Sequence, residues 1–168
     1  LFRSNGETEI TNCKGHLYEL LKPDEYSEKY KIWAFDNLPI IPKQFLYKKT
    51  ESTKFQTNLV LSLLKKHQND KIIIATDADR EGELIARIIF NQAGLTNTSK
   101  CFRFWVSEAL TTPVIQKGLS QLKPWNDYSE LAKKGYARQH ADWLVGMNFS
   151  PYATLLAGKR ATFPVGRV

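Results

Sequence analysis

Residues 71–89 read KIIIATDADREGELIARII, and this stretch decides the fold of the chain. Its opening run KIIIAT is continuous, largely β-branched and bounded by charge, which is typical of a strand buried on both faces of a parallel sheet. The run ends at Asp77. The apolar residues that follow recur at helical spacing, Glu81 and Glu83 suit a first helical turn, and Gly94 can close the helix in a left-handed conformation. The stretch therefore predicts a buried strand, an acidic turn and an amphipathic helix.

The segments around this stretch predict an α/β alternation. Hydrophobic spacing, capping residues and prolines indicate strands in TEITNC (8–13) and QFLYKK (44–49), a helix over 52–68, a strand over 102–106, and a helix opening at Thr112-Pro113. Alternating helices and strands are typical of an α/β domain.

The pattern changes at residues 123–126, KPWN, beyond which only helices are predicted. One runs from about Asp127 to Gly146, and a short one begins at Ser150-Pro151 and ends near Gly158. We place a domain boundary at this change.

The composition limits the class of protein. The chain has 168 residues, of which 42% are hydrophobic and 24% charged, so it can bury one sizeable core and is neither collagen-like nor disordered. No apolar run approaches the roughly 18 residues of a membrane span, and the first residues lack the apolar stretch of a signal peptide. We therefore expect a soluble cytoplasmic protein with no membrane partner. Because no Met begins the chain, Leu1 reads as an internal cut of a longer protein.

Cysteine spacing and net charge add two expectations. Cys13 and Cys101 stand far apart without a CxxC motif, so neither a zinc site nor a disulfide framework is predicted. Lys and Arg number 24 against 17 acidic residues, and the resulting net charge of +7 fits a polyanionic partner without establishing one.

Four carboxylates crowd the end of the buried strand and the start of the helix after it: Asp77, Asp79, Glu81 and Glu83. Ligands of an open parallel sheet bind at the carboxyl ends of its strands, and Asp77 and Asp79 lie on one side of an extended segment. Mg²⁺ fits this pattern because it prefers hard oxygen ligands and completes its octahedron with water and phosphate. Alternatively, the acids only favour the helix N-terminus and pair with Arg80 and Arg87.

The segment ATDADREGE (75–83) resembles the DxDxE signature of the toprim domain, in the long form carried by type IA DNA topoisomerases and especially their topoisomerase III branch. Four further segments resemble motifs of that family in the same order along the chain: GHLYEL (15–20), LPIIP (38–42), ADWLVGMNFSP (141–151) and VGRV (165–168). Five motifs in order are far more specific than one short DxD.

The resemblance implies an α/β fold, a toprim (Rossmann-like) parallel sheet flanked by helices and followed by an all-α segment. Residues 1–122 would form a toprim domain that lacks its first strand, because no EKP-like or ESP-like motif precedes TEITNC. Residues 123–168 would be the truncated start of the helical topoisomerase domain.

The same resemblance implies an activity. The parent protein would cleave and rejoin one DNA strand through a 5′-phosphotyrosine link, with Mg²⁺ (or Mn²⁺) but without ATP, and so relax or decatenate DNA. By analogy, Asp77, Asp79 and Glu81 would be the metal ligands, and Glu81 would also assist proton transfer to and from the 3′ oxygen. None of the seven tyrosines lies in the motif of the nucleophile, so this chain alone is expected not to cut DNA.

Two further residues fall where the family has catalytic side chains. His16, in GHL, could bond a phosphate or orient a neighbouring acid. Arg103 could hold a phosphate bidentately, or it could instead pair with Asp77 or Glu108.

The predicted DNA-binding residues are basic: Arg80, Arg138, Lys159 and Arg167. Arg138 could alternatively form a surface pair with Asp142 at i,i+4 spacing. Trp33, Trp105, Trp125 and Trp143 could stack on bases, although such residues more often belong to the core. The expected partner is DNA, preferentially single-stranded, and the expected parent is a monomeric, nucleoid-associated protein of bacterial type.

Two other functions remain open on the sequence alone. A toprim primase or nuclease would share the acids but should lack GHL, DWLVGMN and VGRV. A non-catalytic DNA-binding module would use the acids structurally, and it predicts that Asp77→Asn leaves magnesium affinity unchanged.

Overall fold

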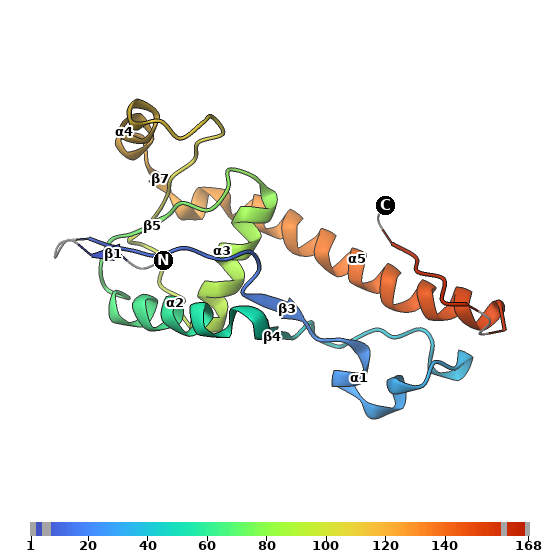
Figure 1. The fold of residues 1–168 in the computed structure, drawn as a ribbon. Helices are drawn as coiled ribbons and strands as arrows, with labels where there is room; N and C mark the ends of the chain where they lie inside the picture. The colour runs from blue at the N-terminus through green and yellow to red at the C-terminus, as the bar shows by residue number, and fades with distance from the viewer. Residues whose placement is uncertain (1–2, 5–7, 159–160, 167–168) are drawn as a thin grey trace. The chain divides into compact units, whose positions relative to one another are not determined.

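The computed structural model in Figure 1 describes residues 3–4, 8–158 and 161–166, and it divides into two units. The sheet unit comprises Leu1–Tyr18 and Lys49–Gly135, and the helical unit comprises Glu19–Lys48 and Tyr136–Val168. The units are interleaved along the chain, whereas we predicted successive domains at 1–122 and 123–168. That division stays a prediction.

A three-stranded sheet organises the sheet unit, with the order β5 (Ile72–Ile74), β6 (Cys101–Arg103) and β7 (Lys123–Pro124). Strands β5 and β6 are parallel, with Ile72 opposite Cys101 and Ile74 opposite Arg103. Strand β7 runs antiparallel to β6. Helix α3 (Arg80–Ala93) connects the two parallel strands, and α4 (Thr112–Ser120) connects β6 to β7. The predicted α/β fold is therefore confirmed.

Strand β5 is buried on one face only, which corrects the prediction made from KIIIAT. Ile74 is buried, whereas Ile73 is 40% exposed. Successive side chains of a strand point to opposite faces, and Ile74 faces the core that α3 covers. From the continuous apolar run we therefore predicted more burial on the Ile73 face of β5 than the structure shows.

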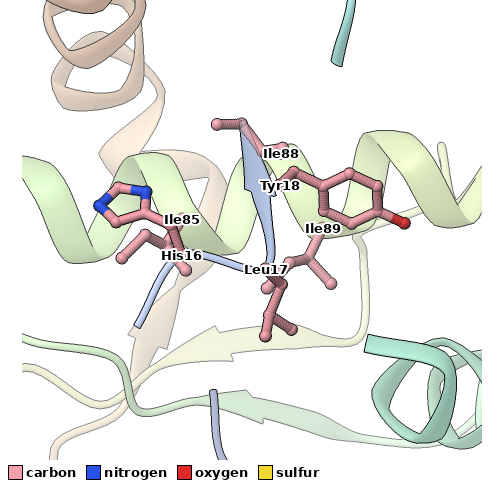
Figure 2. A pocket seen from close by; sticks show the side chains of 6 residues that line it. All are labelled: His16, Leu17, Tyr18, Ile85, Ile88 and Ile89. Carbon is pink, nitrogen blue, oxygen red and sulfur yellow. The ribbon is translucent and has the colours of Figure 1, made fainter. Parts of the chain in front are cut away.

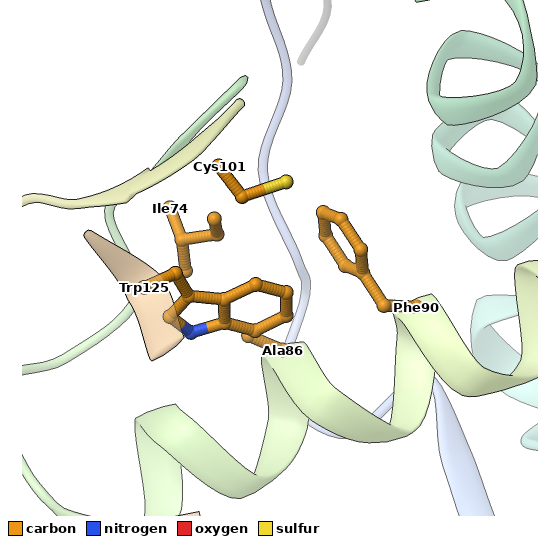
Figure 3. Close-up of a cluster of buried hydrophobic side chains, with 5 residues drawn as sticks. All are labelled: Ile74, Ala86, Phe90, Cys101 and Trp125. Carbon is orange, nitrogen blue, oxygen red and sulfur yellow. The ribbon is translucent and has the colours of Figure 1, made fainter. Parts of the chain in front are cut away.

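The core beside α3 is built from both helical and strand residues. Figure 3 shows five buried side chains at its centre: Ile74, Ala86, Phe90, Cys101 and Trp125. The Phe90 and Trp125 rings meet edge to face with centroids 4.5 Å apart. Leu64 of helix α2 (Lys54–Lys66) packs against this cluster. Trp125 follows β7 directly, so residues just beyond our predicted boundary at 122/123 take part in this core.

Helix α3 begins and ends where the sequence predicts. Asp79 caps its N-terminus, and Gly94 follows its last residue with φ of +73°, a left-handed conformation that glycine adopts without a Cβ penalty. Helix α4 likewise starts at Thr112 and carries Pro113 in its first turn.

The remaining strands are short. Strand β1 (Arg3–Ser4) pairs antiparallel with β2 (Glu9–Ile10), so only two residues of TEITNC form a strand. Strands β3 (Tyr18–Leu20) and β4 (Tyr47–Lys49) form a second two-stranded sheet, and β4 lies within the predicted QFLYKK segment.

One helix, which begins in the sheet unit and continues into the helical unit, replaces the two helices that we predicted between residues 127 and 158. Helix α5 (Ser129–Leu156) is continuous and contains Pro151 in its interior. A proline removes one main-chain hydrogen bond, but the bonds on both sides continue the helix, so one lost bond did not end it. Within the helical unit the short helix α1 is Pro23–Tyr26. Asn148 accepts a hydrogen bond from the Ile40 N–H and donates one to its carbonyl, which joins the LPIIP segment to α5.

In the ranges that the structure describes, we find no helix with both the length and the apolar character that crossing a bilayer requires.

Candidate metal and catalytic site

The acidic loop, residues 75–79, joins the end of β5 to the start of α3. The Gly82 N–H donates a hydrogen bond to Oδ1 of Asp79 at 2.7 Å, which satisfies one of the main-chain donors that a helix N-terminus leaves unpaired. Asp77, Asp79 and Glu81 are exposed. The sequence therefore folds so that three of the four predicted acids face solvent around one helix end.

Gly82 allows the first turn of α3 to lie directly on the acidic loop. A Cβ atom at this position would overlap the backbone oxygen and nitrogen of Asp77. The Thr76 hydroxyl also donates to the Gly82 carbonyl at 2.8 Å. The loop and the helix are thus held together by a contact that a larger residue at position 82 would break.

Glu83, the fourth acid, lies beneath the loop and is fully buried. Its Oε2 accepts from Nε of Arg103 at 3.1 Å, and its Oε1 accepts from Nε of Arg87 at 2.8 Å. Arg87 also donates to the Trp125 carbonyl at 2.8 Å and lies over the Trp125 ring. One buried carboxylate is therefore shared by two guanidinium groups.

Arg103 is also fully buried, and its guanidinium fixes the backbone of the loop from below. Its Nη1 lies within hydrogen-bond distance of the carbonyl oxygens of Ile74, Thr76 and Phe104, at 3.0, 2.8 and 2.8 Å. Its Nη2 donates to the Asp77 carbonyl at 2.5 Å. Burial lowers the pKa of Arg103, and the charge of Glu83 and its hydrogen bond oppose that effect.

The carboxylate partner of Arg103 differs from both alternatives that the sequence offered. Neither Asp77 nor Glu108 forms the ion pair; Glu83 does, and Asp77 is contacted only through its carbonyl. Contact of Arg103 with a phosphate stays a prediction.

His16 lies beside the third acid of the signature. Its Nε2 is 3.1 Å from Oε1 of Glu81, and both side chains are about half exposed. Figure 2 shows the side chains that line a pocket next to α3, where Leu17 and Tyr18 pack beside the apolar side of the helix: His16, Leu17, Tyr18, Ile85, Ile88 and Ile89. This packing presents His16 at the first turn of α3. Its role in orienting a neighbouring acid stays a prediction.

The available donors, which are carboxylate oxygens, are of the type that Mg²⁺ prefers. Among the residues that the structure describes, none donates a hydrogen bond to the Asp77 carboxylate, and only one of the two Asp79 carboxylate oxygens accepts one. Mg²⁺ usually takes one or two carboxylates and completes its shell with water and substrate oxygens. Across residues 3–4, 8–158 and 161–166, no three His, Cys, Asp or Glu side chains converge closely enough to form a complete protein cage.

The predicted DNA-binding residues belong to different parts of the chain. Arg80 is half-buried at the start of α3. Arg138 lies in the helical unit, where its Nε is 3.7 Å from Oδ2 of Asp142, so the alternative surface pair is formed. Lys159 and Arg167 lie outside the described residues. Of the four tryptophans, Trp125 and Trp143 are buried, whereas Trp33 and Trp105 are more than a third exposed.

Sequence reasoning missed the burial of Glu83 and its pairing with Arg103, because we had grouped it with the other three acids; its pairing with Arg87 is part of the alternative that the sequence left open. Two signals pointed to the inward position of Glu83. Glu83 and Arg87 stand at i,i+4 on one helix. Arg103 lies two residues after Cys101 on the next strand, so both side chains point to the same, inward face of the sheet.

Comparison with known proteins agrees with this geometry. The model of the toprim domain matches residues 1–109. The chain is 41% identical over 151 residues to DNA topoisomerase 3 of Staphylococcus epidermidis, covering 87% of this chain and 21% of that protein. It is 39% identical over 139 residues to DNA topoisomerase 3 of Bacillus cereus, covering 83% of this chain and 19% of that protein.

The chain thus spans about a fifth of the length of the curated relatives it matches. The toprim match extends over well more than half of the chain and includes the whole acidic loop. A signature loop after a parallel strand and a matching family model lead to one conclusion: the chain belongs to the toprim domain family.

Proposed function

We propose that this chain is the metal-binding part of a type IA DNA topoisomerase of the topoisomerase III branch. The observation that carries the proposal is a pair of exposed carboxylates, Asp77 and Asp79, on a loop whose backbone is fixed from below by Arg103. The 41% identity to a protein named DNA topoisomerase 3 supports the same branch. The whole protein then cleaves and rejoins one DNA strand without ATP, and so relaxes or decatenates DNA.

In this proposal, Asp77 and Asp79 hold Mg²⁺, for which Mn²⁺ can substitute, and Glu81 is the third acid of the site. When bound, the ion supplies charge stabilisation to the phosphate that is being transferred. Glu81 gives a proton to the 3′ oxygen during cleavage and takes it back during rejoining. His16, 3.1 Å from Glu81, orients that carboxylate.

The nucleophile is a tyrosine of the whole protein outside these 168 residues. Its hydroxyl oxygen bonds to phosphorus and loses its proton, the bond from phosphorus to the 3′ oxygen breaks, and the 3′ oxygen is protonated. The reverse step restores the phosphodiester. Because the phosphotyrosine ester retains the bond energy, no ATP is consumed.

DNA, preferentially single-stranded, is the proposed partner, and Arg80, Arg138, Lys159 and Arg167 are the proposed contacts. The net charge of +7 supports a polyanionic partner, and affinity should fall as salt displaces the contacts with phosphates. We place the monomeric parent in a bacterial cytoplasm, associated with the nucleoid.

The test uses the whole protein with single-stranded DNA labelled at one end. After incubation with Mg²⁺ and denaturation, we expect a covalent adduct on the 5′ phosphate and rejoining that requires the metal. Asp77→Asn should lose metal-dependent rejoining, whereas Asp24→Asn, at an exposed aspartate of α1, should not. Metal-dependent free ends without an adduct would indicate a nuclease instead. Unchanged magnesium affinity in Asp77→Asn would indicate a binding module with structural acids.

A further inference from the structure

Glu83 is an ionisable group that the proposed chemistry does not use. Its side chain is 0% exposed, as is that of Arg103, and both of its carboxylate oxygens accept hydrogen bonds from arginines. A buried carboxylate is costly unless it is paired and hydrogen-bonded. Glu83 therefore cannot serve as a metal ligand without giving up the contacts that make its burial possible.

The acidic segment thus divides its carboxylates between two sides of the loop. Asp77, Asp79 and Glu81 face solvent, whereas Glu83 faces inward toward the arginines. The inward carboxylate compensates the charge of Arg103. Arg103 in turn binds the backbone at the end of β5 and in the acidic loop, at the carbonyls of Ile74, Thr76 and Asp77.

We infer that Glu83 is a positioning residue for the metal site, acting through Arg103 on the backbone that carries Asp77 and Asp79. The inference rests on the proposed function, because it requires Asp77 and Asp79 to be metal ligands. Without the Glu83 charge, the Arg103 guanidinium loses the partner that fixes its Nε, and the carbonyls at the end of β5 lose a fixed donor. The two carboxylates then no longer hold their spacing.

The experiment measures Mn²⁺ affinity of the whole protein by electron paramagnetic resonance, in the absence of DNA. We expect Glu83→Gln to weaken Mn²⁺ binding about 10- to 100-fold, the usual effect of removing a group that orients a metal ligand. Glu108→Gln is the matched control: it removes the same charge from an exposed site beyond β6, and its affinity should equal that of the wild type.

A second variant separates positioning from stability. Arg103→Lys keeps the buried charge pair but loses the planar fork that reaches several carbonyls, so it should fold and still bind Mn²⁺ more weakly. The shift in Tm on adding Mn²⁺ provides a second readout. A purely structural role would lower Tm equally with and without Mn²⁺ and leave this shift unchanged, whereas positioning predicts a smaller shift.

The outcomes distinguish this inference from the proposed function. If the wild type binds Mn²⁺ and Asp77→Asn does not, the proposed metal site is supported. Wild-type Mn²⁺ affinity in Glu83→Gln then overturns the positioning role alone. If Glu83→Gln does not fold, wild-type affinity in Arg103→Lys overturns it in the same way. If Asp77→Asn binds Mn²⁺ as the wild type does, the proposed function fails. Weaker binding in the Glu83 and Arg103 variants, with wild-type binding in Glu108→Gln, supports the inference.

Discussion

Two ionic clusters of the sheet unit use similar side chains but differ in exposure to water. The buried cluster consists of Glu83 with Arg87 and Arg103. The surface cluster consists of Glu9, Lys66, His67 and Asp70, in which the two imidazole nitrogens of His67 lie 2.6 Å from Glu9 and 2.7 Å from Asp70.

This difference in exposure decides which of the two clusters determines the structure. Water can replace a partner in the surface cluster, so losing one member costs little. In the buried cluster a lost partner leaves a charge in a low-dielectric interior, so each member depends on the others. We therefore expect the buried cluster to determine the stability of the fold and the position of the acidic loop. We expect the surface cluster to affect mainly how stability depends on pH.

The largest expected effect comes from breaking the buried cluster. Arg103→Met leaves Glu83 buried with one arginine and leaves loop carbonyls without their donor, and we expect a loss of about 3–5 kcal/mol in the free energy of unfolding. Urea unfolding followed by circular dichroism measures it. A loss no greater than that of a surface substitution would contradict the distinction between the two clusters.

A smaller effect is expected at the contact between α3 and the acidic loop. Gly82→Ala places a Cβ against the Asp77 backbone, and the displacement should cost about 1–3 kcal/mol of unfolding free energy and weaken Mn²⁺ binding. Gly166→Ala is the control, because a Cβ there meets no atom within 4 Å in the described chain. Equal effects of the two changes would rule out the close contact as their cause.

The smallest expected effect is the pH response of the surface cluster. Hydrogen bonds to Asp70 and then Glu9 raise the pKa of His67. A pKa raised on folding stabilises the protein fully below the unfolded value and loses that contribution as the pH rises through the folded value. The urea midpoint of the wild type should fall slightly as the pH rises above the unfolded histidine value of about 6.5.

His67→Gln should flatten this response. The Glu9 pKa is lowered, by Lys66 and then His67, so the contribution of Glu9 is present above its unfolded pKa and is lost as the pH falls through the folded one. The surface cluster is therefore strongest between these two transitions. An identical pH profile in wild type and His67→Gln would show that His67 does not carry the response.

Local signals in the sequence predicted much of the fold. Glu81 and Glu83 marked the first turn of α3 and Gly94 its end, and the resemblance of ATDADREGE to the toprim signature identified the family. The errors concern information that is not local. Ser150-Pro151 resembles a helix start in isolation, yet it lies inside α5. The exposure of Ile73 depends on what covers the far face of the sheet, which its own segment does not encode.

The candidate site, like the fold, could be predicted only in part from the sequence. The exposure of Asp77, Asp79 and Glu81 follows from the local turn between β5 and α3, whereas the contact of His16 with Glu81 joins distant parts of the chain and was suggested only by the family resemblance. The roles of these residues stay predictions. The inward direction of Glu83 depends on Arg103, twenty residues further along the chain. A spacing rule that treats four acids as one cluster cannot separate the residue that faces the core.

The hydrogen bonds from β6 to the acidic loop also bear on the order of assembly. All the acids lie between Asp77 and Glu83, but the guanidinium that fixes the Asp77 carbonyl comes from 26 residues later. A nascent chain that has emerged only as far as α3 carries every carboxylate and the contacts of the loop with α3, but not the guanidinium that holds the loop from below. The same strand that pairs with β5 therefore also brings the donor that completes the support of the acidic loop.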